Sequence, residues 1–189
     1  MLAFMDAAGL QRVHYLGESI GGIIGILFAT RWPARLKSLT ICNSPTELRR
    51  ADGQASTGSR SSVANTLAND GSRDWARLLM EQRVISGNSP AHTEWVLNEV
   101  SKTPAHVLKG ITRTLDGADT SPLLPQVKVP TLVLAPSQSP ITWLSDQIKM
   151  RTLIPNARIA VVEGPGHEIY VDRAEECIDA FLKFLRSLN

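Results

Sequence analysis

Apolar residues along this chain fall into two alternating patterns. Strands with both faces buried appear as nearly continuous apolar runs. The chain has runs of this kind at 12–16, 36–43, 130–135 and 158–163. Apolar positions at helical spacing accompany them, at 2–8, 23–29, 141–153 and 172–188. Strands that alternate with helices predict an α/β fold, with a mostly parallel sheet and helices on both faces.

The pattern changes in the middle of the chain. Small and polar residues dominate segment 53–62, which we expect to be a mobile loop. Helical spacing then returns without a strong strand signal, at 72–85, 91–100 and 104–115. This predicts a helical cap inserted into a core, with the core at 1–45 and 126–189 and the cap at 46–125. At the start of the last helix, Asp172 and Glu175 have the spacing of a capping box.

Charge and composition exclude several kinds of partner. The formal net charge is +2 without any run of lysine and arginine, which argues against nucleic acid or an anionic membrane as partner. No apolar run is long enough to span a membrane, and the first ten residues lack the basic start of a signal peptide. Cys42 and Cys177 lie in apolar contexts without C-x-x-C spacing, as reduced thiols do. We expect a cytoplasmic protein that acts on a small molecule.

One serine stands between two glycines at the point where the first strand turns into a helix. Residues 17–21 read Gly-Glu-Ser-Ile-Gly, the G-x-S-x-G pattern of a nucleophile elbow. In such a turn the backbone of Ser19 is strained and its oxygen is exposed above the sheet. We expect Gly17 and Gly21 to be the residues that let strand and helix approach closely. The alternative is a serine that merely closes a turn.

The order of these parts resembles the α/β-hydrolase superfamily over essentially the whole chain. The resemblance rests on the elbow, on Pro-Thr-Leu-Val-Leu-Ala at 130–135 and on Gly-Pro-Gly-His at 164–167. Segment 121–130 is most similar to the 3-oxoadipate enol-lactonase and small esterase branch. The resemblance implies the α/β-hydrolase fold with Ser19 as nucleophile and His167 as base, and no metal or organic cofactor. It also implies that the Ile20 backbone N–H helps to form the oxyanion hole.

The other histidines fit structural roles better than a catalytic one. His14 lies in an apolar strand, and His92 and His106 lie in the predicted cap helices. His167 follows the carboxyl end of a strand, where parallel sheets place their ligands.

Two features depart from the family pattern. Only one helix precedes the elbow strand, so we expect an N-terminally truncated hydrolase that lacks the loop with the second oxyanion donor; a natural minimal hydrolase is the alternative. The elbow strand would then be an unprotected sheet edge that recruits other copies, so a homo-oligomer is among the expected states. Whether the residues present suffice for turnover stays open.

The second departure concerns the acid of the catalytic triad. Ser139 stands where the family places aspartate, and Asn43 occupies the alternative position. Neither side chain can balance the charge of an imidazolium ion. Glu47 and Asp146 are nearby carboxylates that fit solvated surface charges better, and Glu163 and Glu168 are too close in sequence to His167 to reach behind its ring. No acid is assigned.

Substrate contacts have to come from the cap and the loops above Ser19. Trp143 is the first candidate for lining an apolar pocket. Further candidates are Trp75, Trp95, Arg73, Arg77 and Arg83. The sequence predicts a serine hydrolase that cleaves a carboxylic ester or lactone through an acyl-enzyme on Ser19. The alternatives are hydrolysis of carbon–carbon bonds in ring-cleavage products and a catalytically inactive member.

Overall fold

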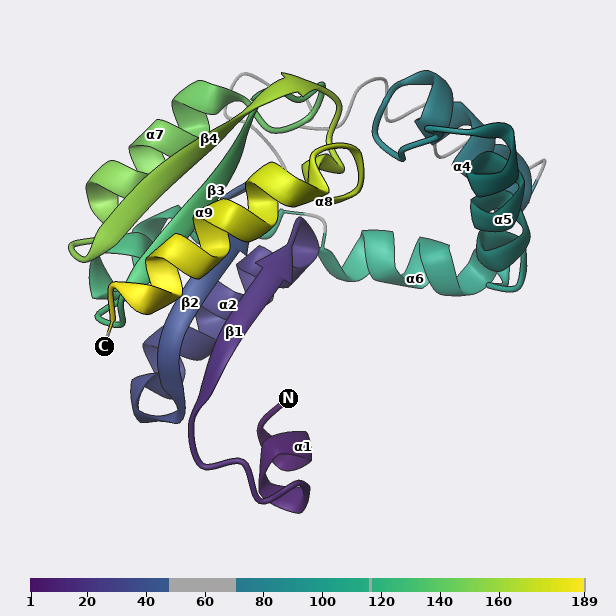
Figure 1. The fold of residues 1–189 in the computed structure, drawn as a ribbon. Helices are drawn as coiled ribbons and strands as arrows, with labels where there is room; N and C mark the ends of the chain where they lie inside the picture. The colour runs from purple at the N-terminus through teal and green to yellow at the C-terminus, as the bar shows by residue number, and fades with distance from the viewer. Residues whose placement is uncertain (48–70, 116, 189) are drawn as a thin grey trace.

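The computed structural model describes residues 1–47, 71–115 and 117–188 (Figure 1). Its centre is a parallel sheet in which each strand lies beside the next in the chain. The strands are β1 (Val13–Glu18), β2 (Leu36–Cys42), β3 (Thr131–Gln138) and β4 (Ala157–Pro165). The prediction of a parallel sheet is confirmed. Segment 53–62, predicted as a loop, lies outside the described residues.

The carboxyl ends of the strands bring together residues that are far apart in the sequence. Glu18 is aligned with Cys42, and Cys42 with Leu134. The residues that follow these strands therefore lie along one end of the sheet. Within the described sheet β1 is an edge strand, and the Leu16 side chain on it is 48% exposed. The first strand is thus less covered than a continuous apolar run suggests.

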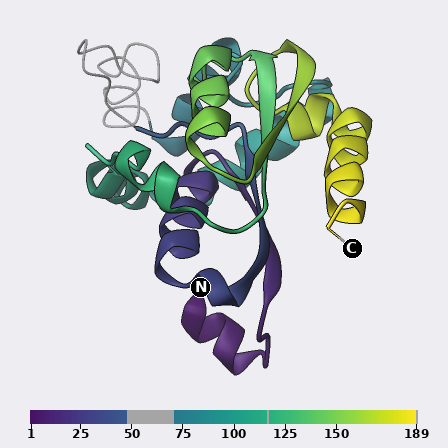
Figure 2. The same cartoon turned by 90° about the vertical axis from the view of Figure 1, so that its left-hand side faces the viewer.

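Helices cover both faces of the sheet (Figure 2). Helices α2 (Ile20–Arg31) and α7 (Leu144–Leu153) pack on one face, and α9 (Ala174–Arg186) packs on the other. The larger core cluster lies on the α2 and α7 side, and includes Ile26, Leu39, Val133 and Met150. A smaller cluster contains Cys42 and Cys177, and burial raises the pKa of both thiols, that of Cys177 to about 11. The thiols therefore stay protonated near neutral pH.

The remaining helices extend from this core. Helix α1 (Leu2–Ala7) precedes β1, and short 3₁₀ helices form at Pro33–Arg35 and Ser121–Gln126. Figure 1 shows three helices set apart from the sheet, namely α4 (Ser72–Glu81), α5 (Pro90–Ser101) and α6 (Ala105–Leu115). Among the helices that the structure describes, none has the length and apolar character needed to cross a membrane.

The predicted capping box of the last helix is wrong. Asp172, expected at the start of the last helix, instead ends the short helix α8 (Ile169–Asp172), and the residue before α9 is Arg173, which makes no side-chain cap. The Asp172 carboxylate instead accepts a hydrogen bond of 2.8 Å from the Ser86 hydroxyl. A hydrogen bond to a residue distant in sequence has displaced the local one.

Candidate active site

Ser19 lies at the junction of β1 and α2 in a strained backbone conformation. Its φ of 49° is in the left-handed region that side chains with a Cβ rarely adopt. Two backbone contacts hold it there: the Ser19 N–H donates to the Cys42 carbonyl at 3.0 Å, and the Ser44 hydroxyl donates to the Ser19 carbonyl at 2.6 Å. This is the backbone geometry of a nucleophile elbow.

Close packing at the elbow depends on Gly17 and Gly22. A Cβ on Gly17 would overlap the carbonyl of Gly21, and one on Gly22 would overlap the Ser44 side chain. A Cβ on Gly21 would have its nearest contact at 3.8 Å, with the Tyr15 hydroxyl. The prediction for Gly17 is confirmed, whereas that for Gly21 is wrong. Gly21 contributes its carbonyl, which accepts a 2.8 Å hydrogen bond from Tyr15.

Helix α2 begins at Ile20, directly after the serine. The N–H groups in the first turn of a helix have no acceptor within it, and the positive end of the helix dipole lies there. The Ile20 N–H therefore has the location that an oxyanion donor needs. Its role stays a prediction.

His167 lies in the loop between β4 and α8 and is 3% exposed. Its backbone is fixed from two directions. The His167 N–H donates to the Arg83 carbonyl at 3.1 Å, and the Asn43 amide donates to the His167 carbonyl. The loop is thus tied both to the end of β2 and to the segment that follows α4.

Behind the ring, His167 Nδ1 lies 3.2 Å from the Ser139 hydroxyl and 3.5 Å from that of Thr142. The Ser139 oxygen also accepts the backbone N–H groups of Ile141 and Thr142, at 3.3 and 3.1 Å. The Thr142 hydroxyl donates to the Asn43 side-chain carbonyl at 2.5 Å. Both positions at which the family places its acid, 139 and 43, therefore belong to one hydrogen-bond network around the ring.

This network has a consequence for the proton of the neutral ring. A hydroxyl oxygen has two lone pairs, and those of Ser139 are used by two backbone N–H groups. Its own proton can donate to Nδ1, which places the ring proton on Nε2, whereas the Thr142 hydroxyl has given its proton to Asn43 and can only accept from Nδ1–H. A general base for Ser19 needs a bare Nε2. A carboxylate at position 139, with about four lone-pair sites, could accept all three donors and hold the ring proton on Nδ1.

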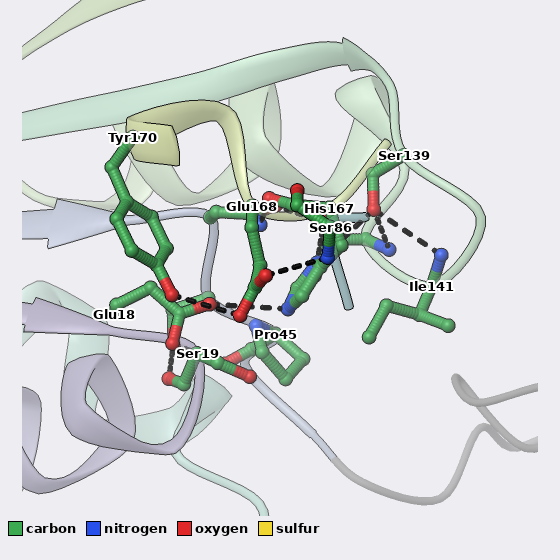
Figure 3. Close-up of polar contacts among 12 residues, drawn as sticks. Glu18, Ser19, Pro45, Ser86, Ser139, Ile141, His167, Glu168 and Tyr170 are labelled. Atoms are coloured by element: carbon green, nitrogen blue, oxygen red, sulfur yellow. Dashed lines mark hydrogen bonds and ion pairs between the residues drawn. The ribbon is translucent and has the colours of Figure 1, made fainter. Parts of the chain in front are cut away.

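On the other side of the ring, Glu18 Oε1 lies 3.3 Å from His167 Nε2. The contact lacks hydrogen-bond geometry, and the buried Nε2 has no hydrogen-bond partner within the described residues. Figure 3 shows Ser139 on one side of the ring and Glu18, beside Ser19, on the other. Sequence reasoning missed Glu18 because it fills a variable position of the elbow motif. The available signal was an acidic residue next to the nucleophile, in a chain that has Ser139 and Asn43 at the two positions where the family places its acid.

The other candidate acids are placed elsewhere. The backbone of Glu47 pairs with that of Asp119 in an isolated β-bridge. Glu47 also lines a small hollow together with Trp143 and Asp146. Glu163 is exposed at the end of β4. Of the carboxylates in the described parts of the chain, Glu18 is the one within ion-pair distance of the His167 ring.

Glu168 and Tyr170 form a second polar group beside Glu18 (Figure 3). Glu168 accepts the Ser86 backbone N–H at 2.7 Å and the Tyr170 hydroxyl at 2.9 Å. Burial raises the pKa of Tyr170, and the charges of Glu168 and Glu18 raise it further. Tyr170 therefore stays protonated and acts as a donor in this group.

The residues expected to contact a substrate include exposed tryptophans and an arginine that pairs with a carboxylate. Trp143 is 46% exposed and lines the small hollow, and its role in substrate binding stays a prediction. Trp95 is 60% exposed and stacks on His92. Arg73 pairs with Glu94 at 2.8 Å.

Arg77 and Arg83 are two further candidates, whose role in binding a substrate carboxylate stays a prediction, and His14 is expected to be structural. Arg77 lies 3.8 Å from Asp74. Arg83 contributes its carbonyl to the His167 loop. His14 lies 2.8 Å from the Ser38 hydroxyl, a structural contact.

Comparison with known proteins agrees with this geometry. A family model described as "alpha/beta hydrolase fold" matches residues 1–174. The chain is 25% identical to 3-oxoadipate enol-lactonase 1 of Acinetobacter baylyi, over 100% of this chain and 70% of the relative. It is 24% identical to 2-hydroxy-6-oxo-6-phenylhexa-2,4-dienoate hydrolase of Comamonas testosteroni, over 96% of this chain and 65% of the relative.

The fold is also similar to that of solved structures. An esterase from Exiguobacterium antarcticum matches with a TM-score of 0.86 at 17% identity, over 97% of this chain and 70% of the other. The chain thus spans 65 to 70% of the length of these three proteins.

Proposed function

This chain belongs to the alpha/beta hydrolase fold family, and on that premise we propose that it hydrolyses a carboxylic ester or lactone with Ser19 as nucleophile and His167 as base. The observation that carries the proposal is the strained backbone of Ser19 at the end of β1, at the same end of the sheet as the buried His167. An enol-lactonase among the relatives supports the substrate class.

The proposed reaction has two steps. In the first, the Ser19 oxygen bonds to the substrate carbonyl carbon while its proton passes to His167 Nε2, and the Ile20 N–H donates to the developing oxyanion. The bond to the leaving oxygen then breaks, and this oxygen takes the proton from His167. In the second step, water gives a proton to His167 and its oxygen bonds to the acyl carbon. The bond between this carbon and the Ser19 oxygen then breaks, the acid leaves, and His167 returns the proton to Ser19.

The neutral network behind His167 sets a cost for this reaction. Nε2 can accept the Ser19 proton only in the tautomer that carries the ring proton on Nδ1. In that tautomer a neutral hydroxyl, of Ser139 or Thr142, accepts from Nδ1 where the triad has a carboxylate. We therefore expect slower hydrolysis than a triad with a carboxylate at this position would give.

Labelling with a fluorophosphonate tests the proposal, because this probe reacts with an activated serine and its adduct is read by mass spectrometry. We expect one adduct on Ser19, none on the Ser19→Ala variant, and turnover of short p-nitrophenyl esters. An unlabelled Ser19 would support the inactive-member alternative. A carbon–carbon substrate analogue in the same assay tests the alternative reaction.

A further inference from the structure

We propose that Glu18 is the charge partner of His167 and balances, from the nucleophile side of the ring, the positive charge that Ser139 cannot balance from behind. The inference rests on the proposed function, because it concerns the imidazolium ion formed when His167 takes the Ser19 proton. Glu18 does not exchange atoms with the substrate in this scheme. It is a positioning residue that acts through His167.

Glu18 lies close to the buried ring of His167. Glu18 Oε1 lies 3.3 Å from Nε2, the nitrogen that receives the proton. The His167 side chain is 4% exposed and that of Glu18 is 30% exposed, so the ring side of the pair is shielded from solvent. A carboxylate at this distance attracts the positive charge that forms on the ring during the reaction.

The contact between the Glu18 carboxylate and His167 Nε2 is not aligned as a hydrogen bond. Nε2 has no hydrogen-bond partner in the described part of the molecule, because the carboxylate lies beside the nitrogen without hydrogen-bond alignment. Electrostatic attraction needs only proximity, whereas a hydrogen bond would occupy the nitrogen. In the tautomer that carries the ring proton on Nδ1, Glu18 can therefore stabilise the charged ring and leave Nε2 open to the Ser19 proton.

The other described groups that contact the ring are neutral. Ser139 and Thr142 present hydroxyls to Nδ1. The described groups that hold the His167 backbone are the Asn43 amide and the Arg83 carbonyl. Among the described residues, Glu18 thus supplies the negative charge that this ring contacts.

A double-mutant cycle with Glu18→Gln and Ser139→Asp tests the proposal. The measured quantities are the rate of Ser19 phosphonylation by a fluorophosphonate, and kcat and KM for p-nitrophenyl acetate. We expect Glu18→Gln to lower the phosphonylation rate and kcat about 10- to 100-fold while KM stays within about 3-fold. In the Ser139→Asp background the same change should cost less than about 3-fold, since a carboxylate then lies behind the ring.

Glu163→Gln is the matched control, because it removes an exposed carboxylate four residues from His167 and should leave both rates within about 2-fold. Thermal midpoints of all variants separate a loss of charge from a loss of folding. Equal losses from Glu18→Gln in both backgrounds, or no loss in either, would overturn the role of Glu18 while labelled Ser19 keeps the proposed function. If only the Ser139→Asp variants are labelled, Glu18 does not replace the acid. If Ser19 is labelled in no variant, the proposed function fails, and this inference with it.

Discussion

The two halves of the site are held in place by different forces. At the nucleophile, backbone atoms touch backbone atoms: Gly17 lies against the carbonyl of Gly21, and Ser19 is held at φ 49°. At the base, side chains contact the ring, with Ser139 and Glu18 on opposite sides of His167. The comparison teaches that the place of the nucleophile follows from steric constraint, whereas the proton state of the base depends on a few exchangeable side chains.

The largest expected effect removes the nucleophile without disturbing the elbow. Ser19→Ala should lower esterase activity about 10³-fold or more, because the covalent step is lost. Its thermal midpoint should change little, since the serine hydroxyl contributes little packing. Ser101→Ala, on the exposed end of α5, is the control. Retention of more than about a tenth of the activity would exclude Ser19 as nucleophile.

The next effect tests whether sterics alone fix the elbow. Gly17→Ala should destabilise the fold by about 3 kcal/mol or more, since its Cβ would overlap a backbone carbonyl that cannot move aside. Gly21→Ala is the matched control in the same motif, with 3.8 Å of clearance, and should change stability by less than about 1 kcal/mol. Chemical denaturation of both variants measures the difference. Equal losses would contradict the assignment of close packing to Gly17.

The side-chain half of the comparison is tested by Ser139→Asp. A carboxylate there can accept Nδ1–H together with the two backbone N–H groups, so we expect the hydrolysis rate to rise about 10-fold or more. Glu47→Gln and Asp146→Asn serve as comparison variants and should leave the rate near the wild-type value. A neutral or harmful Ser139→Asp, with a loss in either comparison variant, would show that another carboxylate already serves.

A smaller effect concerns the anchoring of the histidine loop. Ser86 is 7% exposed, and its hydroxyl donates to the Asp172 carboxylate. Ser86→Ala should cost about 1–3 kcal/mol, because the carboxylate loses a partly buried donor. Hydrogen exchange should become faster in residues 164–173 and stay unchanged in 17–22. Faster exchange at the elbow would show that the two halves are not independently held.

The smallest expected effect involves pH and the strand that leads to the elbow. Burial, with the nearby Lys37 charge, lowers the pKa of His14 below its ordinary value of 6.5. Below pH 6.5 the unfolded chain then binds this proton more readily than the folded chain, so stability falls as the pH drops through the folded-state pKa. Urea titrations at pH 7.5 and 5.5 should show this loss, and His14→Gln should reduce it. An unchanged pH dependence in that variant would assign the loss to other groups.

What could be predicted from sequence follows the same division. The order of strands and helices and the position of the elbow depend on local spacing, and the structure confirms the parallel sheet. Tertiary contacts decided the rest. Gly22 packs closely against Ser44. Asp172 accepts a hydrogen bond from Ser86 instead of capping the last helix. The sequence shows Glu18 as an acid next to the nucleophile, but its contact with the ring of a histidine so distant in sequence depends on the tertiary fold.

Hydrogen bonds between the His167 loop and the segment after α4 make the order of the loop depend on the position of that segment. Three hydrogen bonds span this junction: the His167 N–H donates to the Arg83 carbonyl, and Ser86 donates to Glu168 and to Asp172. A displacement of residues 83–86 would remove all three restraints at once. The position of this segment and the order of the histidine loop are therefore thermodynamically coupled, so that whatever stabilises one of them stabilises the other to the same degree.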